Sequence, residues 1–139
     1  MYAYTNDSTW ETIVHGLVQT ANVTFFTPFS NSTGIMYEQI CEKRALCSTD
    51  QSSFKGSLAN WMGKTAVLVP SVSDDIMALL KSSAQGAAAS CSGGSNSTCG
   101  TRWYVDAYDG QTGFGQELSA LDTVLSLLVT DAPKLAALG

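Results

Sequence analysis

Basic side chains and histidine are scarce in this chain of 139 residues. It carries 7 lysines and arginines against 12 aspartates and glutamates, which gives a net charge of −5. No basic stripe is present that could neutralise a phosphate backbone, so nucleic acid is not an expected partner. The single histidine, His15, has no second ligand at helical spacing. We therefore expect neither a metal site nor a cofactor.

Long hydrophobic runs are also missing. The longest apolar stretch near the C-terminus covers residues 120–129 and is interrupted by Asp122, Thr123 and Ser126. It falls short of the roughly 20 apolar residues that a bilayer span needs, so we expect no transmembrane segment. The hydrophobic content is still 45%. That is enough for the core of one domain, or part of one, but not of two.

Four glycosylation sequons of the form Asn-x-Ser/Thr stand out, none with proline in the middle. They begin at Asn6, Asn22, Asn31 and Asn96. One sequon occurs by chance in many proteins, but four in so short a chain indicate a secreted glycoprotein. The first six residues contain neither the basic nor the apolar region of a signal peptide. We therefore expect the true N-terminus to lie upstream.

The four cysteines form two close pairs in the sequence, Cys41 with Cys47 and Cys91 with Cys99. A zinc site would favour a shorter Cys-x(2–4)-Cys spacing, often with histidine nearby. Disulfides suit a secreted chain better. Four cysteines formally allow three pairings, and we predict the two local ones, because short loops rich in Ser or Gly bring each pair together.

Apolar periodicity predicts four helices, over residues 9–21, 53–69, 73–90 and 114–128. Thr9 and Ser73 are the candidate N-caps of the first and third. The second and fourth are apolar nearly all round, so we expect them to be buried on most sides, with Trp61 in the core. Such helices alternate with two amphipathic ones, which indicates an inner and an outer layer.

The connections carry two further expectations. Residues 35–40 are predicted to form a short strand that leads into the first cysteine pair. Residues 91–113 form a long loop rich in glycine and aromatic residues, longer than a compact domain normally needs. We take this loop as a candidate functional segment.

Two segments contain motifs that, in combination, resemble glycoside hydrolase family 76. One is residues 42–62, which includes Phe54-Lys55-Gly56. The other is residues 83–121, whose matching elements are Cys91-Ser92-Gly93-Gly94, Cys99-Gly100-Thr101-Arg102-Trp103-Tyr104, Asp109-Gly110, and Gly113-Phe114-Gly115-Gln116-Glu117. The resemblance covers nearly the whole chain.

That family contains endo-α-1,6-mannanases and fungal cell-wall mannosidase-like proteins thought to attach glycosylphosphatidylinositol-linked proteins to wall glycan. The resemblance implies an all-α fold, in which residues 1–139 are the C-terminal third of an (α/α)6 barrel and a partial catalytic domain. It implies α-mannan or cell-wall glycan, and the missing N-terminal part of the barrel, as partners. It also implies a secreted or cell-wall protein, or a membrane-anchored one in its full-length form.

Hydrolysis of an α-mannoside needs two carboxyl groups. The resemblance places the catalytic aspartates on an earlier inner helix, as an adjacent pair. Asp74 and Asp75 match that pair in residue type but not in position. They lie at the start of an outer helix, where the helix dipole explains the presence of carboxylates. We therefore assign no catalytic residue and expect this chain alone to be inactive. A non-catalytic glycan-binding protein and a wall transglycosylase are the alternatives.

Five residues are candidates for contact with a sugar. Trp103 and Tyr104 offer flat apolar faces for a pyranose ring, while Lys55, Asp109 and Gln116 could form hydrogen bonds to hydroxyl groups. Each of these residues could instead have a structural role. Lys55 could instead form an ion pair that staples the barrel, and Trp103 could pack beneath its own loop.

Overall fold

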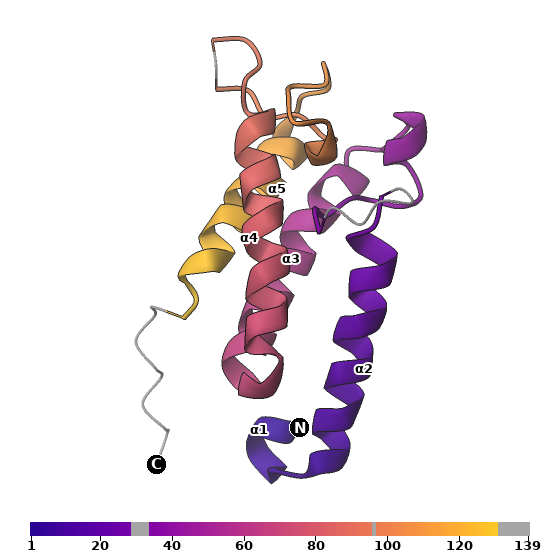
Figure 1. Ribbon diagram of the computed structural model, residues 1–139. Helices are drawn as coiled ribbons and strands as arrows, with labels where there is room; N and C mark the ends of the chain where they lie inside the picture. The colour runs from indigo at the N-terminus through magenta and orange to yellow at the C-terminus, as the bar shows by residue number, and fades with distance from the viewer. Residues whose placement is uncertain (29–33, 96, 131–139) are drawn as a thin grey trace.

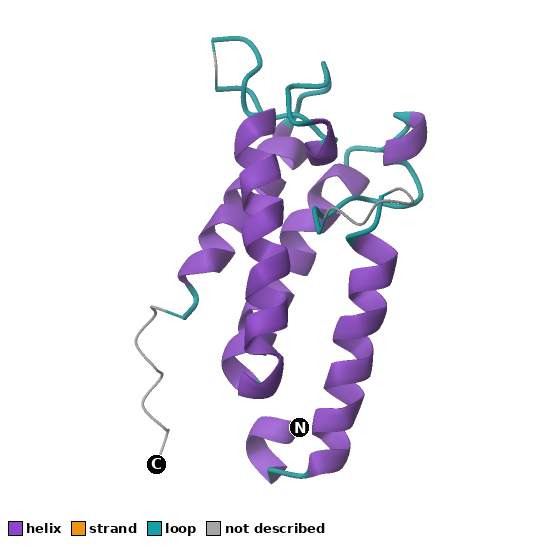
Figure 2. Ribbon diagram, in the orientation of Figure 1, coloured by secondary structure: helices purple, strands orange, loops and turns teal. Residues whose placement is uncertain are grey.

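The computed structural model describes residues 1–28, 34–95 and 97–130, and helices dominate that part of the chain (Figures 1 and 2). The α-helices are α1 (Tyr2–Thr5), α2 (Ser8–Phe25), α3 (Phe54–Leu68), α4 (Ser73–Ser90) and α5 (Phe114–Leu125). Single 3₁₀ turns occupy Glu42–Arg44, Gln51–Ser53, Pro70–Val72, Trp103–Val105 and Ser126–Leu128. The four long helices lie where the apolar periodicity predicts them. None of the described helices combines the length and apolarity that a bilayer span requires.

The prediction of a short strand at residues 35–40 is wrong. This segment is extended in part but pairs with no strand among the described residues, where one isolated bridge, between Gly93 and Thr98, is found. The Tyr37 N–H links this segment to α2 by donating to the carbonyl of Phe25 at 2.9 Å. Met36 and Tyr37 are both buried. An extended stretch that is covered by helices can bury successive side chains without a ladder.

Two predicted helix caps also need correction. The N-cap of α2 is Asp7, whose carboxylate accepts a hydrogen bond from the backbone N–H of Thr9 at 2.8 Å. Thr9 is therefore the residue that is capped. Helix α4 has Val72 at its N-cap position, without a side-chain hydrogen bond. The 3₁₀ turn Pro70–Val72 leads directly into the helix, so Ser73 falls inside the first turn rather than before it.

Helices α3, α4 and α5 pack on one another and hold most of the core. The α3–α5 contact is close because small residues face it. The Gly56 N–H donates to the Ser119 hydroxyl at 3.2 Å, and that hydroxyl donates to the carbonyl of Ser52 at 2.8 Å. A Cβ atom on Gly115 would lie 2.9 Å from the carbonyl oxygen of Thr49, too close for any side chain. The start of α5 is thereby held against the turn before α3.

Helix α2 lies beside this unit (Figure 1), and its backbone comes near the 3₁₀ turn Pro70–Val72. None of its residues is fully buried, although Val14, Val18 and Phe25 pack against the core. Helix α3 is exposed on the face that is not covered by α4 and α5, and Trp61 on that face keeps 67% of its surface. The expectation that Trp61 lies in the core is wrong for this chain. Leu121 on α5 is exposed in the same way.

These exposed faces predict self-association. Apolar side chains such as Trp61, Leu68 and Leu121 remain exposed to water. The free-energy cost of this exposure scales with the exposed apolar surface area. We expect the purified chain to form dimers or larger species in sedimentation velocity at micromolar concentration. Trp61→Lys should shift the distribution toward the monomer. A monomer that shows a sharp cooperative melt and no concentration dependence would contradict this expectation.

Candidate functional site

Two loops meet at the end of the molecule where α3 and α5 begin and α4 ends (Figure 2). We call residues 41–47 the cysteine loop and residues 91–113 the aromatic loop. A disulfide closes the cysteine loop between Cys41 and Cys47, and a second joins Cys91 to Cys99 within the aromatic loop. Both pairs are local, as the spacing predicts. All five candidate sugar contacts lie in or beside these loops.

Lys55, in the first turn of α3, connects the two loops. Its Nζ lies 2.8 Å from Oε1 of Glu42 in the cysteine loop, and the two side chains are 4% and 0% exposed. Nζ also donates a hydrogen bond to the carbonyl of Thr101 and lies 3.8 Å from the centroid of the Trp103 ring. One ammonium group therefore binds a carboxylate, a carbonyl and an aromatic face from two separate segments.

Burial disfavours the charged form of both members of this ion pair, and the charge of each partner favours it. Burial raises the pKa of Glu42, and the charge of Lys55 opposes that rise. Burial likewise lowers the pKa of Lys55, and the charge of Glu42 opposes that fall. Among the described residues, Oε2 of Glu42 has no hydrogen-bond partner. Removing either member would leave the other charge buried and unpaired.

Lys55 and Trp103 have almost no free surface in this structure. Trp103 is completely buried, and its indole N–H donates to the carbonyl of Gly100 at 3.2 Å. The geometry therefore favours the structural alternatives for both residues. Lys55 staples the loops, and Trp103 packs beneath the aromatic loop. Neither side chain can touch a sugar without the loops opening.

Asp109 organises the aromatic loop. Its carboxylate, 1% exposed, accepts hydrogen bonds from the backbone N–H groups of Thr101, Arg102 and Gln111 at 3.0–3.2 Å, and from Nε of Arg102 at 3.0 Å. Burial alone would raise the pKa of Asp109. The hydrogen bonds outweigh it, with that from the Arg102 side chain the largest, and hold the pKa below its ordinary value.

Gln116 and Tyr104 have partly exposed side chains. The Gln116 amide donates to the hydroxyls of Ser52 at 3.3 Å and Thr101 at 3.0 Å, so it joins α5 to both neighbouring segments. Tyr104 packs edge-to-face on Tyr37, with ring centroids 6.3 Å apart. Burial, followed by the charge of Glu42, raises the pKa of Tyr104 to about 12. The Tyr104 hydroxyl is therefore protonated and a potential donor over the whole physiological range.

An open groove runs between the cysteine loop and the start of α5. It encloses about 450 Å³ and is lined by residues that include Thr49, Gln111, Phe114 and Gln116. The Phe114 side chain is 77% exposed at its edge. From the sequence, Phe114 is the first residue of a predicted apolar helix, and neither Gln111 nor Glu42 is a predicted site residue. Only the position of Phe114, directly after a glycine-rich loop, hinted at another role.

Asp74 and Asp75 lie far from this groove. Both are exposed in the first turn of α4, whereas the aromatic loop begins after the last turn of the same helix. At 1.5 Å per residue, the 18 residues of α4 place the two aspartates roughly 25 Å from the start of the aromatic loop. No three His, Cys, Asp or Glu side chains gather as a metal site within residues 1–28, 34–95 and 97–130.

The sequons differ in how they are presented. Asn6 is exposed just after α1, and Asn22 is half-buried on α2. Asn31 and Asn96 lie outside the described residues.

Comparison with known proteins gives one consistent family. The family model for glycosyl hydrolase family 76 matches residues 1–138. The chain is 40% identical over 130 residues to mannan endo-1,6-alpha-mannosidase DFG5 of Candida albicans, covering 93% of this chain and 28% of that protein. It is 38% identical over 135 residues to the DFG5 protein of Saccharomyces cerevisiae, again covering 28% of the relative. The chain thus spans less than a third of the length of these relatives.

A solved structure agrees. The crystal structure of Dfg5 from Chaetomium thermophilum in complex with glucosamine superposes with a TM-score of 0.85 at 30% identity, over 95% of this chain and 33% of that one. The predicted all-α fold with four long helices is confirmed by this match.

Proposed function

This chain belongs to glycosyl hydrolase family 76, a family of (α/α)6 barrels, and we propose that it forms part of a secreted or cell-wall glycosidase that acts on α-1,6-mannan. The observation that carries this proposal is the 40% identity, over 93% of the chain, to a mannan endo-1,6-alpha-mannosidase. Residues 1–139 form the C-terminal part of its catalytic domain in this proposal. Two disulfides suit an extracellular location.

The exposed apolar faces support the idea of a partial domain. Helices α3 and α5 both show apolar side chains to water, as inner helices of a barrel would if their neighbours were absent. Trp61 on α3 and Leu121 on α5 are examples. Further helices of the same protein would cover these faces. The 28% share of the relatives' length leaves ample chain to supply them.

The groove beside Phe114 is the proposed point of sugar contact. The exposed ring of Phe114 suits the apolar face of a pyranose, and Gln111 and Gln116 line the same groove with their amides. Asp109 supports the aromatic loop beside this groove through its hydrogen bonds to Thr101, Arg102 and Gln111, and Lys55 joins that loop to the cysteine loop. In this proposal the catalytic carboxylates come from elsewhere in the protein. Asp74 and Asp75 are at the wrong end of α4 to protonate or attack a sugar in this groove.

A binding experiment with matched variants tests the proposal. The purified chain is titrated with an α-1,6-linked mannooligosaccharide by calorimetry, and the mixture is then analysed by mass spectrometry. We expect binding without cleavage. Phe114→Ala should weaken binding by about tenfold, equivalent to about 1.4 kcal/mol, while Trp61→Ala, an exposed aromatic outside the groove, should leave it unchanged.

Each result separates the candidate functions. Equal affinities for Phe114→Ala and the unmodified chain would place sugar contact elsewhere. Cleavage of the oligosaccharide that is abolished by Asp74→Asn or Asp75→Asn would overturn the assignment of catalysis to another segment. Binding without cleavage by a longer protein that contains the whole barrel would favour the non-catalytic alternative, and transfer to an acceptor sugar would favour a transglycosylase.

A further inference from the structure

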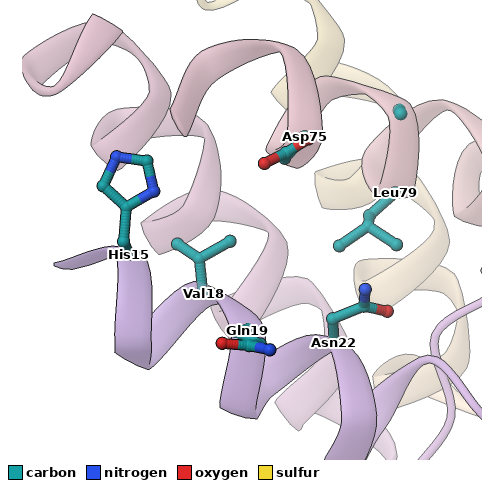
Figure 3. A pocket seen from close by; sticks show the side chains of 7 residues that line it. His15, Val18, Gln19, Asn22, Asp75 and Leu79 are labelled. Carbon is teal, nitrogen blue, oxygen red and sulfur yellow. The ribbon is translucent and has the colours of Figure 1, made fainter. Parts of the chain in front are cut away.

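A second groove lies between α2 and α4, on the part of the molecule away from the loops. It encloses about 490 Å³. Figure 3 shows the side chains that line it: His15, Val18, Gln19 and Asn22 from α2, with Asp75 and Leu79 from α4. Its floor is apolar, and its rim carries an imidazole, two amides and a carboxylate. No step of the proposed function uses this groove.

Helix α2 is weakly attached across this groove. It buries no residue completely, and within the described residues Nε2 of His15 forms a side-chain hydrogen bond to the hydroxyl of Ser71 at 3.1 Å. That contact is exposed and lies near the start of α4. The middle of α2 faces α4 over open space, so any group that filled the space would add contacts to both helices.

Asn22 is the residue from which such a group can grow. It begins the sequon Asn22-Val23-Thr24, and its amide points into the groove toward Leu79 (Figure 3). Its side chain makes no hydrogen bond with any residue in the described part of the chain. The amide nitrogen is thus free for modification and directed at a cavity. Asn6, the sequon asparagine at the end of α1, is exposed and is not among the residues that line this groove.

We propose that an N-linked glycan on Asn22 fills the groove with its first N-acetylglucosamine and ties α2 to α4. A C–N bond forms between the sugar C1 and the Asn22 amide nitrogen. The C1–O bond to a glycosyl pyrophosphate donor breaks, and the amide loses one proton. The pyranose ring and acetamido methyl pack on Val18 and Leu79, and polar groups of the sugar reach Gln19 and Asp75.

The test compares glycosylated forms of the full 139-residue chain made in a secreting eukaryotic host. Glycopeptide mass spectrometry reports occupancy of Asn22, and hydrogen exchange reports the opening of α2. Removing the sequon by Thr24→Ala, which keeps Asn22 itself, should speed amide exchange in α2 by at least fivefold. Trimming the glycan enzymatically to a single N-acetylglucosamine should preserve the protection. Asn6→Gln should leave α2 unchanged.

A further variant distinguishes packing in the groove from a general effect of glycosylation. Asp75→Asn should speed α2 exchange when the glycan is present and have little effect when it is absent, because the carboxylate then has no sugar to bind. The proposal is overturned if Asn22 is not glycosylated. It is equally overturned if Thr24→Ala and Asn6→Gln change α2 exchange alike, or if a single remaining sugar gives no protection. None of these readouts depends on mannan binding or cleavage.

Discussion

Replacement of Lys55 by alanine should lower the free energy of unfolding by about 3–5 kcal/mol, the usual cost of breaking a buried ion pair from one side. Glu42 would then be left uncompensated in a site where its side chain is 0% exposed. The carbonyl of Thr101 would lose its donor, and Trp103 would lose the cation over its ring. Chemical denaturation monitored by tryptophan fluorescence measures the effect.

Lys64→Ala is the matched control, because Lys64 lies on the same helix and is exposed. It should change stability by less than about 0.5 kcal/mol. The double variant Glu42→Leu with Lys55→Met removes both charges, and it should be far less damaging than Lys55→Ala alone. If Lys55→Ala is as mild as Lys64→Ala, the pair does not hold the loops together.

The pH dependence of Lys55→Ala gives an independent check. Burial already raises the pKa of Glu42 in the folded state, and loss of the Lys55 charge must raise it further. A carboxyl whose folded pKa exceeds its unfolded value is most favourable to folding at low pH, and its contribution turns against folding as pH rises past the unfolded value. The penalty of Lys55→Ala should therefore shrink as pH is lowered toward 4.5, the ordinary value for Glu42.

Replacement of Asp109 by alanine should have the second largest effect, about 3 kcal/mol. The change removes the acceptor of three backbone N–H groups and of the Arg102 side chain together. Unsatisfied donors in a part-buried loop cost about 1–3 kcal/mol each when water cannot replace the lost partner fully. We expect the segment from Thr101 to Gln111 to exchange its amide hydrogens faster, alongside the loss of global stability.

A conservative pair of variants isolates the charge. Asp109→Asn retains one acceptor oxygen, while Asp106→Asn makes the same change at an exposed position of the same loop. Because the folded pKa of Asp109 is lowered, its stabilisation is present above its ordinary value of 3.8 and is lost as pH falls through the folded value. Asp109→Asn should abolish this acid-dependent loss, and Asp106→Asn should not. Identical acid profiles for the two variants would count against the assigned role of Asp109.

Local patterns in the sequence determined much of this protein. The 3.6-residue periodicity located all four long helices, because each must bury an apolar stripe wherever it packs. Close spacing of the cysteines was enough to predict Cys41–Cys47 and Cys91–Cys99, which close short loops. The motifs around Lys55 and Trp103 were enough to identify the family. The predicted N-cap of α2 was wrong by two residues, because Asp7 caps the helix in place of Thr9.

Only the tertiary structure decided what individual side chains do. Lys55 and Gln116 are both predicted sugar contacts from the sequence; in the structure Lys55 is buried against Glu42, whereas Gln116 lines the groove and also donates to Ser52 and Thr101. Trp61 was predicted to lie in the core, and Phe114 begins a helix that was expected to be buried on most sides; both side chains are exposed. Helical periodicity specifies which face of a helix is apolar, but not whether this chain supplies the neighbour that covers it. Glu42 and Lys55 are 13 positions apart in sequence, and only the tertiary structure shows that the first turn of α3 lies against the cysteine loop, so that the two side chains meet.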